Sequence, residues 1–118
     1  MMTVHVSGWA EDLLERYFGQ CGLLEEARKQ IEGLPRELSE RLGRDVSFWE
    51  NVLSNPGSNL LEWAIEKVVR QAEENERRFG KSLCHYLVEA LYNHSIANWI
   101  AGYVSFVIDL AEEDPSKT

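Results

Sequence analysis

The stretch that decides the fold is KSLCHYLVEALYNHSIANWIAGYVSFVIDL, residues 81–110. Its only formal charges are on Lys81, Glu89 and Asp109. Large apolar residues would cover every face of a helix built from it: Leu83, Leu87, Leu91, Ile96, Trp99, Val104, Phe106 and Ile108. A surface helix carries one apolar stripe, whereas a helix that is apolar all round is buried. We therefore expect this stretch to form a central helix, or helix pair, against which the rest of the chain packs.

The length of 118 residues suits one domain, which can bury a core without disulfides or metals. Hydrophobic residues make up 44% of the chain, as in ordinary globular proteins. We predict a single helical domain over residues 1–118, with 112–118 as a frayed polar tail. A β-strand typically shows apolar and polar residues in alternation. No segment of four or more residues shows this pattern convincingly, so the sequence indicates an all-α fold.

The net charge is −8, which makes the surface acidic. An acidic surface repels phosphate backbones, so we expect no direct binding to nucleic acid. The same charge suits a basic protein partner, or an acidic inhibitor that occupies a basic nucleic-acid groove of its target. Solubility is the simplest explanation of the charge.

The two cysteines, Cys21 and Cys84, match no paired-cysteine metal spacing. We expect them to be buried free thiols in a reducing cytosol, and we expect no cofactor or metal. A membrane-spanning helix needs about 20 predominantly apolar residues. The apolar run over 96–110 is shorter and contains Asn98. These features, with no signal peptide recognisable at the N-terminus, predict a cytoplasmic protein without a membrane span.

Glycine and proline divide the first half of the chain into helices. The helical spacing of apolar residues begins at Gly8 or Trp9. The run 33–35, Gly-Leu-Pro, predicts the end of a helix, because proline removes a hydrogen bond inside one. A short helix over 35–42 would follow and would end at Gly43.

The cleanest helical pattern runs over residues 60–79. One face carries the apolar residues Leu60, Leu61, Ala64, Ile65, Val68, Val69 and Ala72. The opposite face offers the i,i+4 ion pairs Glu66–Arg70, Glu73–Arg77 and Glu74–Arg78. Asn59 and Glu62 suit a variant of the capping box, Gly80 would end the helix, and Ser82 can cap the next one. The whole pattern predicts a compact all-α bundle of five or six helices around the central apolar C-terminal segment.

His85 and Glu89 are four residues apart and share a helix face. Two ligands do not make a metal site, so we expect a buried imidazole that is hydrogen-bonded to the carboxylate. Arg78 and His85 have six residues between them. This spacing resembles the arginine–histidine motif of HEPN domains, which are small helical modules that commonly act as dimers. In this chain Phe79 takes a place that is usually polar in the family, and Gly80 interrupts the motif.

The HEPN resemblance implies an alternative function, a dimeric ribonuclease. Arg78 and His85 would then meet across the dimer cleft, and the histidine would act in general acid–base cleavage of RNA. The resemblance covers these two positions only.

Aromatic residues, such as Trp63 at the edge of the apolar face of the helix over 60–79, indicate a different function. An apolar segment as long as 81–110 is hard to cover with four or five shorter helices, so we expect a second copy or another protein to bury part of it. The candidate interface residues are Trp63, Tyr92, Trp99, Tyr103 and Phe106. Our main prediction is a non-enzymatic helical interaction module, an accessory, regulatory or small-subunit protein that self-associates or docks on a larger partner. The HEPN-like ribonuclease and the acidic inhibitor are the alternatives.

Overall fold

The structure is a computed structural model that describes residues 6, 8–55 and 59–113, with the side chains up to residue 107. Six α-helices form this part of the chain, which confirms the predicted all-α bundle. They are α1 (Gly8–Leu13), α2 (Leu24–Leu42), α3 (Val46–Ser54), α4 (Leu60–Phe79), α5 (Leu83–Tyr92) and α6 (Ser95–Glu113). A π-helical turn (Leu14–Phe18) and a 3-10 turn (Gly19–Cys21) continue α1.

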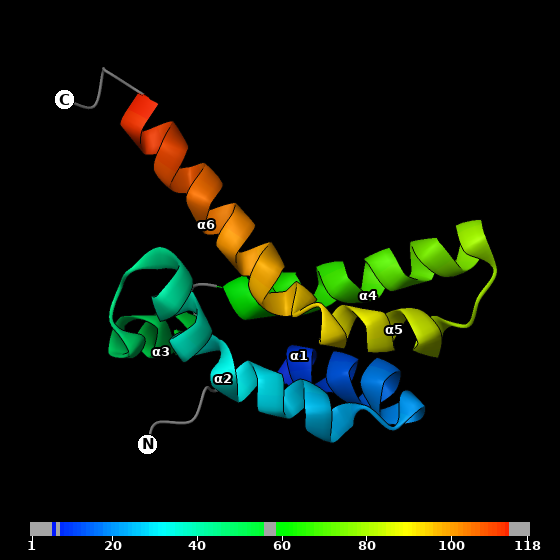
Figure 1. Ribbon diagram of the computed structural model, residues 1–118. Helices are drawn as coiled ribbons and strands as arrows, with labels where there is room; N and C mark the ends of the chain where they lie inside the picture. The colour runs from blue at the N-terminus through cyan, green and yellow to red at the C-terminus, as the bar shows by residue number, and fades with distance from the viewer. Residues whose placement is uncertain (1–5, 7, 56–58, 114–118) are drawn as a thin grey trace.

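The helices pack around one apolar core (Figure 1). α4 contacts α1, α3, α5 and α6, and α2 contacts α3, α5 and α6. Figure 1 shows α4 and α5 side by side, joined by a tight turn, while α6 starts at the centre of the body and runs out of it. Every helix from α1 to α6 contributes buried side chains, among them Leu13, Leu38, Leu53, Ile65, Leu87 and Ile100.

The decisive stretch 81–110 forms a helix pair. α5 ends at Tyr92, and α6 begins at Ser95 after a turn in which His94 has a left-handed backbone (φ 53°). Its first part is buried as expected, through Leu87, Leu91, Ile96, Ala97 and Ile100. Its last part is not: Tyr103, Phe106 and Val107 are exposed. The expected burial fails there because this half of α6 extends beyond the other helices (Figure 1).

The helix end predicted at Gly33-Leu34-Pro35 is wrong. α2 runs without interruption to Leu42, with Pro35 inside it. A proline inside a helix removes one hydrogen bond and crowds the preceding turn. Here Leu34, Pro35 and Leu38 are all buried against the core, and this burial offsets the local cost. The helix ends at Gly43, as predicted, in the left-handed conformation (φ 80°) that glycine adopts most easily.

The boundaries of α4 and α5 follow the sequence closely. α4 spans the predicted residues, and Gly80 ends it with a left-handed backbone (φ 83°). Ser82 caps α5, since its Oγ accepts a hydrogen bond from the His85 backbone N–H at 3.2 Å. The predicted capping box is wrong, because Asn59 is itself left-handed and its side chain forms no cap hydrogen bond.

The ion pairs on α4 have a different spacing from the predicted one. Arg70 Nη1 lies 2.8 Å from Glu73 Oε1, and Arg77 pairs with Glu74. Both pairs are i,i+3 instead of i,i+4. Residues three and four apart are both neighbours on a helix surface, and the exposed side chains choose between them at little energetic difference.

The prediction of two buried free thiols is wrong. Cys21 and Cys84 form a disulfide that joins the 3-10 turn to the start of α5, and both residues are only half-buried. The left-handed turn at Gly22 (φ 71°) redirects the chain there. Pairing of cysteines 63 residues apart depends on this tertiary arrangement, which local sequence patterns do not reveal.

The ends of the chain are described in part. Of the tail expected over 112–118, Glu112 and Glu113 belong to α6, and the remaining residues lie outside the described part. Ser7, a possible cap for α1, also lies outside it. Among the described residues, no helix is both long and apolar enough to cross a membrane.

Candidate functional site

An aromatic cluster lies where α6 leaves the body. The Trp63 ring, on α4, meets the Trp99 ring edge-on, with 5.8 Å between ring centroids. Its centroid is 5.3 Å from that of Tyr103. Trp99, Tyr103 and Phe106 follow one another at helical spacings of four and three residues, so they share one face of α6. The contact between α4 and α6 adds Trp63 to that face.

The cluster borders a surface groove of about 360 Å³, which we call the aromatic groove. Its lining residues are Trp63, Ser95, Asn98, Trp99, Gly102, Tyr103 and Phe106. None of them carries a formal charge. Tyr103 is 48% exposed and Phe106 is 60% exposed. Gly102 leaves the middle of the groove open, because a Cβ added there would meet no atom within 4 Å.

Two cations lie at the edge of the described groove: Arg41, whose Nη1 donates to Asn98 Oδ1 at 2.6 Å, and Lys67. The ammonium group of Lys67 is 5.9 Å from the ring centroids of both Trp63 and Trp99. Such a position allows a cation–π interaction with the indole faces. Sequence reasoning missed Lys67, although its spacing of four residues from Trp63 on α4 places the two on one face.

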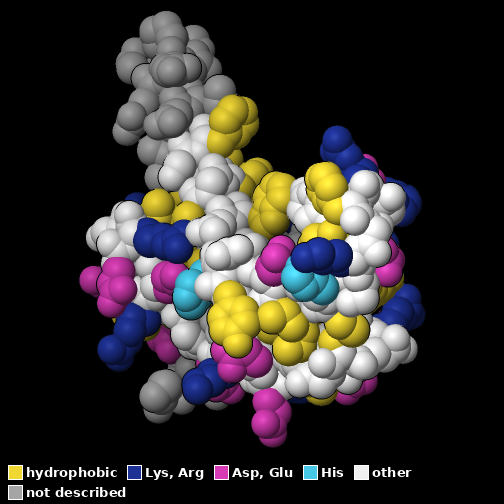
Figure 2. All heavy atoms as spheres, turned by 45° about the vertical axis from the view of Figure 1, so that its right-hand side comes forward, with side chains coloured by type: hydrophobic (Ala, Val, Ile, Leu, Met, Phe, Trp, Pro, Cys, Tyr) yellow, Lys and Arg dark blue, Asp and Glu magenta, His cyan; other side chains and the backbone are white. Residues whose placement is uncertain are grey.

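Exposed apolar side chains continue from the groove along the projecting half of α6. Figure 2 shows hydrophobic side chains on this projection and at its junction with the body. Val107 is 44% exposed there, beside Phe106. Val104 faces a second shallow groove, formed with Phe48 and Trp49 of α3. Contiguous apolar surface of this kind marks interaction sites in soluble proteins.

The fifth candidate interface residue, Tyr92, lies elsewhere. It is 80% exposed at the end of α5 and borders a separate hollow with Leu23, Gln30 and Val88. The structure therefore brings together four of the five candidates, Trp63, Trp99, Tyr103 and Phe106, and leaves Tyr92 apart.

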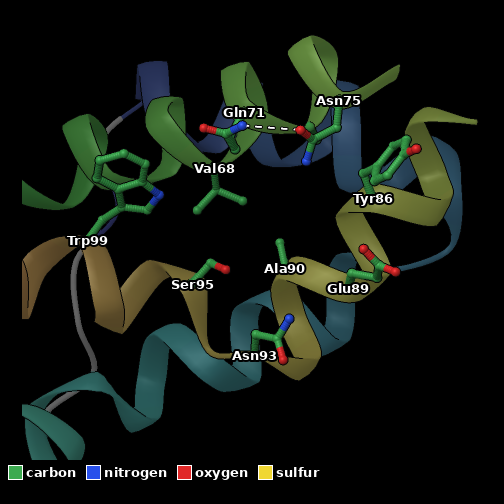
Figure 3. A pocket seen from close by; sticks show the side chains of 10 residues that line it. Val68, Gln71, Asn75, Tyr86, Glu89, Ala90, Asn93, Ser95 and Trp99 are labelled. Carbon is green, nitrogen blue, oxygen red and sulfur yellow. Dashed lines mark hydrogen bonds between the residues drawn. The ribbon is translucent and has the colours of Figure 1, made fainter. Parts of the chain in front are cut away.

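A smaller hollow adjoins the aromatic groove, which we call the polar pocket (Figure 3). It has a volume of about 130 Å³ and lies between α4 on one side and α5 with the start of α6 on the other. Ser95 and Trp99 line both the pocket and the groove, so the two hollows adjoin each other.

Arg78 and His85, the residues of the ribonuclease alternative, stand on either side of the α4–α5 turn. The Arg78 guanidinium lies over the Phe79 ring, 5.7 Å from its centroid. His85 Nε2 is 3.1 Å from Glu89 Oε1, which is the pairing expected from the sequence. The imidazole is not buried as expected, since 38% of its side chain is exposed. Within the described part of the chain, Arg78 and His85 form no hydrogen bond or ring contact with each other.

A metal centre is not formed by the described residues, among which no three histidine, cysteine or acidic side chains converge. No protein-family model, curated protein or solved structure matches this chain. The function is therefore argued from the geometry of the groove and its surroundings.

Proposed function

We propose that this protein is a helical interaction module that acts by binding and not by catalysis. It would self-associate, or dock on a larger protein, through the aromatic groove and the projecting half of α6. One observation carries the proposal: Trp63, Trp99, Tyr103 and Phe106 converge on one uncharged groove that is open to solvent. Tryptophan and tyrosine are the residues most often found as energetic anchors of protein interfaces.

The exposed side chains offer enough apolar surface for such binding. Full burial of a large apolar side chain contributes about 2 kcal/mol. Tyr103, Phe106 and Val107 are each roughly half exposed, and each can therefore contribute about 1 kcal/mol on contact. Trp63 and Trp99 are already partly packed, so they lose little conformational entropy when a partner covers them. These terms favour an interface with a small aromatic centre.

The distribution of charge fits the same role. The chain carries a net charge of −8, but residues 90–107 contain no Asp, Glu, Lys or Arg. A contact through residues 95–107 of α6 therefore avoids the repulsion that two acidic surfaces would otherwise experience. The acidic surface around it would raise the association rate with a basic partner.

The predicted cytoplasmic location stays a prediction, and the Cys21–Cys84 disulfide provides its test. Disulfides persist in oxidising compartments and are rare in the cytosol. Alkylation of thiols in intact cells, followed by mass measurement, distinguishes the two cases. Two alkylated cysteines place the protein in a reducing compartment, and none places it in an oxidising one.

The first experiment measures molar mass by light scattering over a range of protein concentrations. The variant Phe106→Ser removes an anchor of the groove, and Phe79→Ser is its matched control, because Phe79 is 66% exposed at the far end of α4. If the protein self-associates through the groove, Phe106→Ser lowers the average mass and Phe79→Ser does not. Equal effects of the two variants contradict this route.

A monomer at all concentrations directs the test to a partner. A photo-crosslinking residue placed at Tyr103 should then capture one protein in cells, and the same residue placed at Phe79 should not. Phe106→Ser should abolish the product formed at Tyr103. A monomer that forms no product depending on Phe106 overturns the proposal.

A further inference from the structure

The polar pocket has apolar walls and a polar rim. Val68 and Ala72 of α4 and Ala90 of α5 form the apolar walls. Around them stand the polar residues Gln71, Asn75, Tyr86, Glu89, Asn93 and Ser95. Trp99 closes one end, and Figure 3 shows its indole nitrogen on the pocket side. Such a combination suits a ligand with a short apolar stem and a polar head.

Part of the polar rim is not used by the protein itself. Gln71 Nε2 donates to Asn75 Oδ1 at 3.2 Å, which leaves the Gln71 carbonyl oxygen available. The side chains of Asn93 and Ser95 form no hydrogen bond with any other described residue. Figure 3 shows the Ser95 hydroxyl and the Asn93 amide nitrogen on the side of the hollow. The rim therefore offers both hydrogen-bond donors and acceptors to one small volume.

Charge selects the sign of the ligand. Glu89 is the only charged residue among those that line the pocket. One of its oxygens, Oε1, lies 3.1 Å from His85 Nε2, and the other is free to accept a second hydrogen bond within the described structure. On the groove side, the Lys67 ammonium lies over the two indole rings, and Arg41 donates to Asn98. The Glu89 carboxylate, in a protein of net charge −8, favours a cation over an anion.

Size limits the ligand to one side chain. The pocket holds about 130 Å³, and a cavity of about 150 Å³ accommodates a benzene-sized molecule. An alkylammonium chain such as that of lysine is of this size. Its stem would contact Val68 and Ala90, and its ammonium group would reach Glu89.

The position of the pocket next to the aromatic groove indicates the source of that cation. Because Ser95 and Trp99 line both hollows, one polypeptide segment can occupy both. We propose that the polar pocket receives a basic side chain of a partner polypeptide whose apolar side chains lie in the aromatic groove. This proposal rests on the proposed function, and it adds the chemical class of the partner: an apolar segment with a neighbouring basic residue.

The test uses synthetic peptides of defined composition. Each peptide has blocked ends and contains one tryptophan and one lysine, separated by glycine–serine spacers of increasing length. Matched peptides carry norleucine or glutamate in place of lysine. Binding is measured by the shift of the Trp99 indole N–H signal in NMR titrations. The best lysine peptide should bind about tenfold more tightly than its norleucine counterpart, as expected for a hydrogen bond to a charged group, and the glutamate peptide should bind least.

Two variants of the protein locate the effect. Glu89→Gln should remove most of the preference for lysine over norleucine. Glu32→Gln, on the exposed surface of α2, changes the net charge equally and should keep it. Circular dichroism verifies that both variants remain folded. The pocket proposal is overturned if the lysine and norleucine peptides bind with equal affinity, or if the two variants have equal effects. It is also overturned if no lysine peptide shifts the Trp99 signal.

These outcomes are separate from failure of the proposed function. If the norleucine peptide binds as tightly as the lysine peptide, and Phe106→Ser weakens the binding of both, the groove binds apolar segments but the pocket does not select a cation. If Phe106→Ser leaves the binding of every peptide unchanged, the groove is not the binding surface, and the proposed function fails with the pocket proposal.

Discussion

The two halves of α6 both carry large apolar side chains, but their surroundings are opposite. Ile96 and Ile100 in the first half are at most 2% exposed, packed among α2, α4 and α5. Tyr103 and Phe106 in the second half are about half exposed. The difference lies in what covers each half and not in hydrophobicity. Apolar character therefore shows that a helix face favours burial, but it does not show whether its own chain or another molecule supplies the cover.

The largest expected effect concerns the body that holds the buried half. The disulfide between Cys21 and Cys84 closes a loop with a sequence separation of 63. In the chain-entropy model, a loop of this length stabilises the folded state by about 4 kcal/mol. We expect the double variant Cys21→Ser/Cys84→Ser to lose stability of this order in urea unfolding followed by circular dichroism. The oxidised protein treated with a reductant should match it, and an unchanged unfolding midpoint would contradict the prediction.

The second prediction compares the two halves directly. Ile100→Ala leaves a cavity in the core, and it should lower the free energy of unfolding by about 3 kcal/mol. Phe106→Ala removes a larger side chain from the exposed half, and it should change stability by less than about 0.5 kcal/mol. Urea unfolding of dilute protein measures both. Similar losses in the two variants would show that the second half is covered within the monomer.

Much of the fold could be predicted because local signals agree with tertiary packing. The apolar face of α4 and its glycine end at Gly80 both follow from the sequence, whereas the sequence left open whether 81–110 forms one helix or the pair α5 and α6. Where packing overrides a local signal, prediction fails. Pro35 is a helix breaker by itself, yet burial keeps it inside α2. The Cys21–Cys84 pair depends on the meeting of two distant turns.

The candidate site was predictable to the same degree. Trp99, Tyr103 and Phe106 share one face of any helix built from this segment, so their alignment follows from the sequence. That Trp63 joins them, and that Tyr92 does not, depends on how α4 and α5 pack against α6. The polar pocket was missed because its polar residues are scattered over three helices without a motif.

The third prediction uses the glycine between the two halves of α6. Gly102 is helical, and a Cβ there would meet no neighbouring atom. Gly102→Ala should therefore stabilise the protein by about 0.5–1 kcal/mol, because alanine favours the helix more than glycine does. Gly102→Leu should keep the helix but fill the groove, and so weaken peptide binding. Thermal unfolding measures the first effect, and the tryptophan-containing peptides measure the second. A loss of stability in Gly102→Ala would show that the position is crowded.

The smallest expected effect on stability distinguishes binding from the ribonuclease alternative. The His85–Glu89 pair is largely exposed, so His85→Ala should cost less than about 0.5 kcal/mol. In the interaction-module proposal, His85 has no chemical task, and purified wild-type protein should leave single-stranded and hairpin RNA uncut.

Arg78→Ala is the companion variant, because the alternative requires both side chains. If the wild type cleaves RNA, while both variants lose cleavage and keep their helical content, the exposed surface near the α4–α5 turn is catalytic and the binding-only function is wrong. If no cleavage occurs in any form, the comparison within α6 remains the basis for the function.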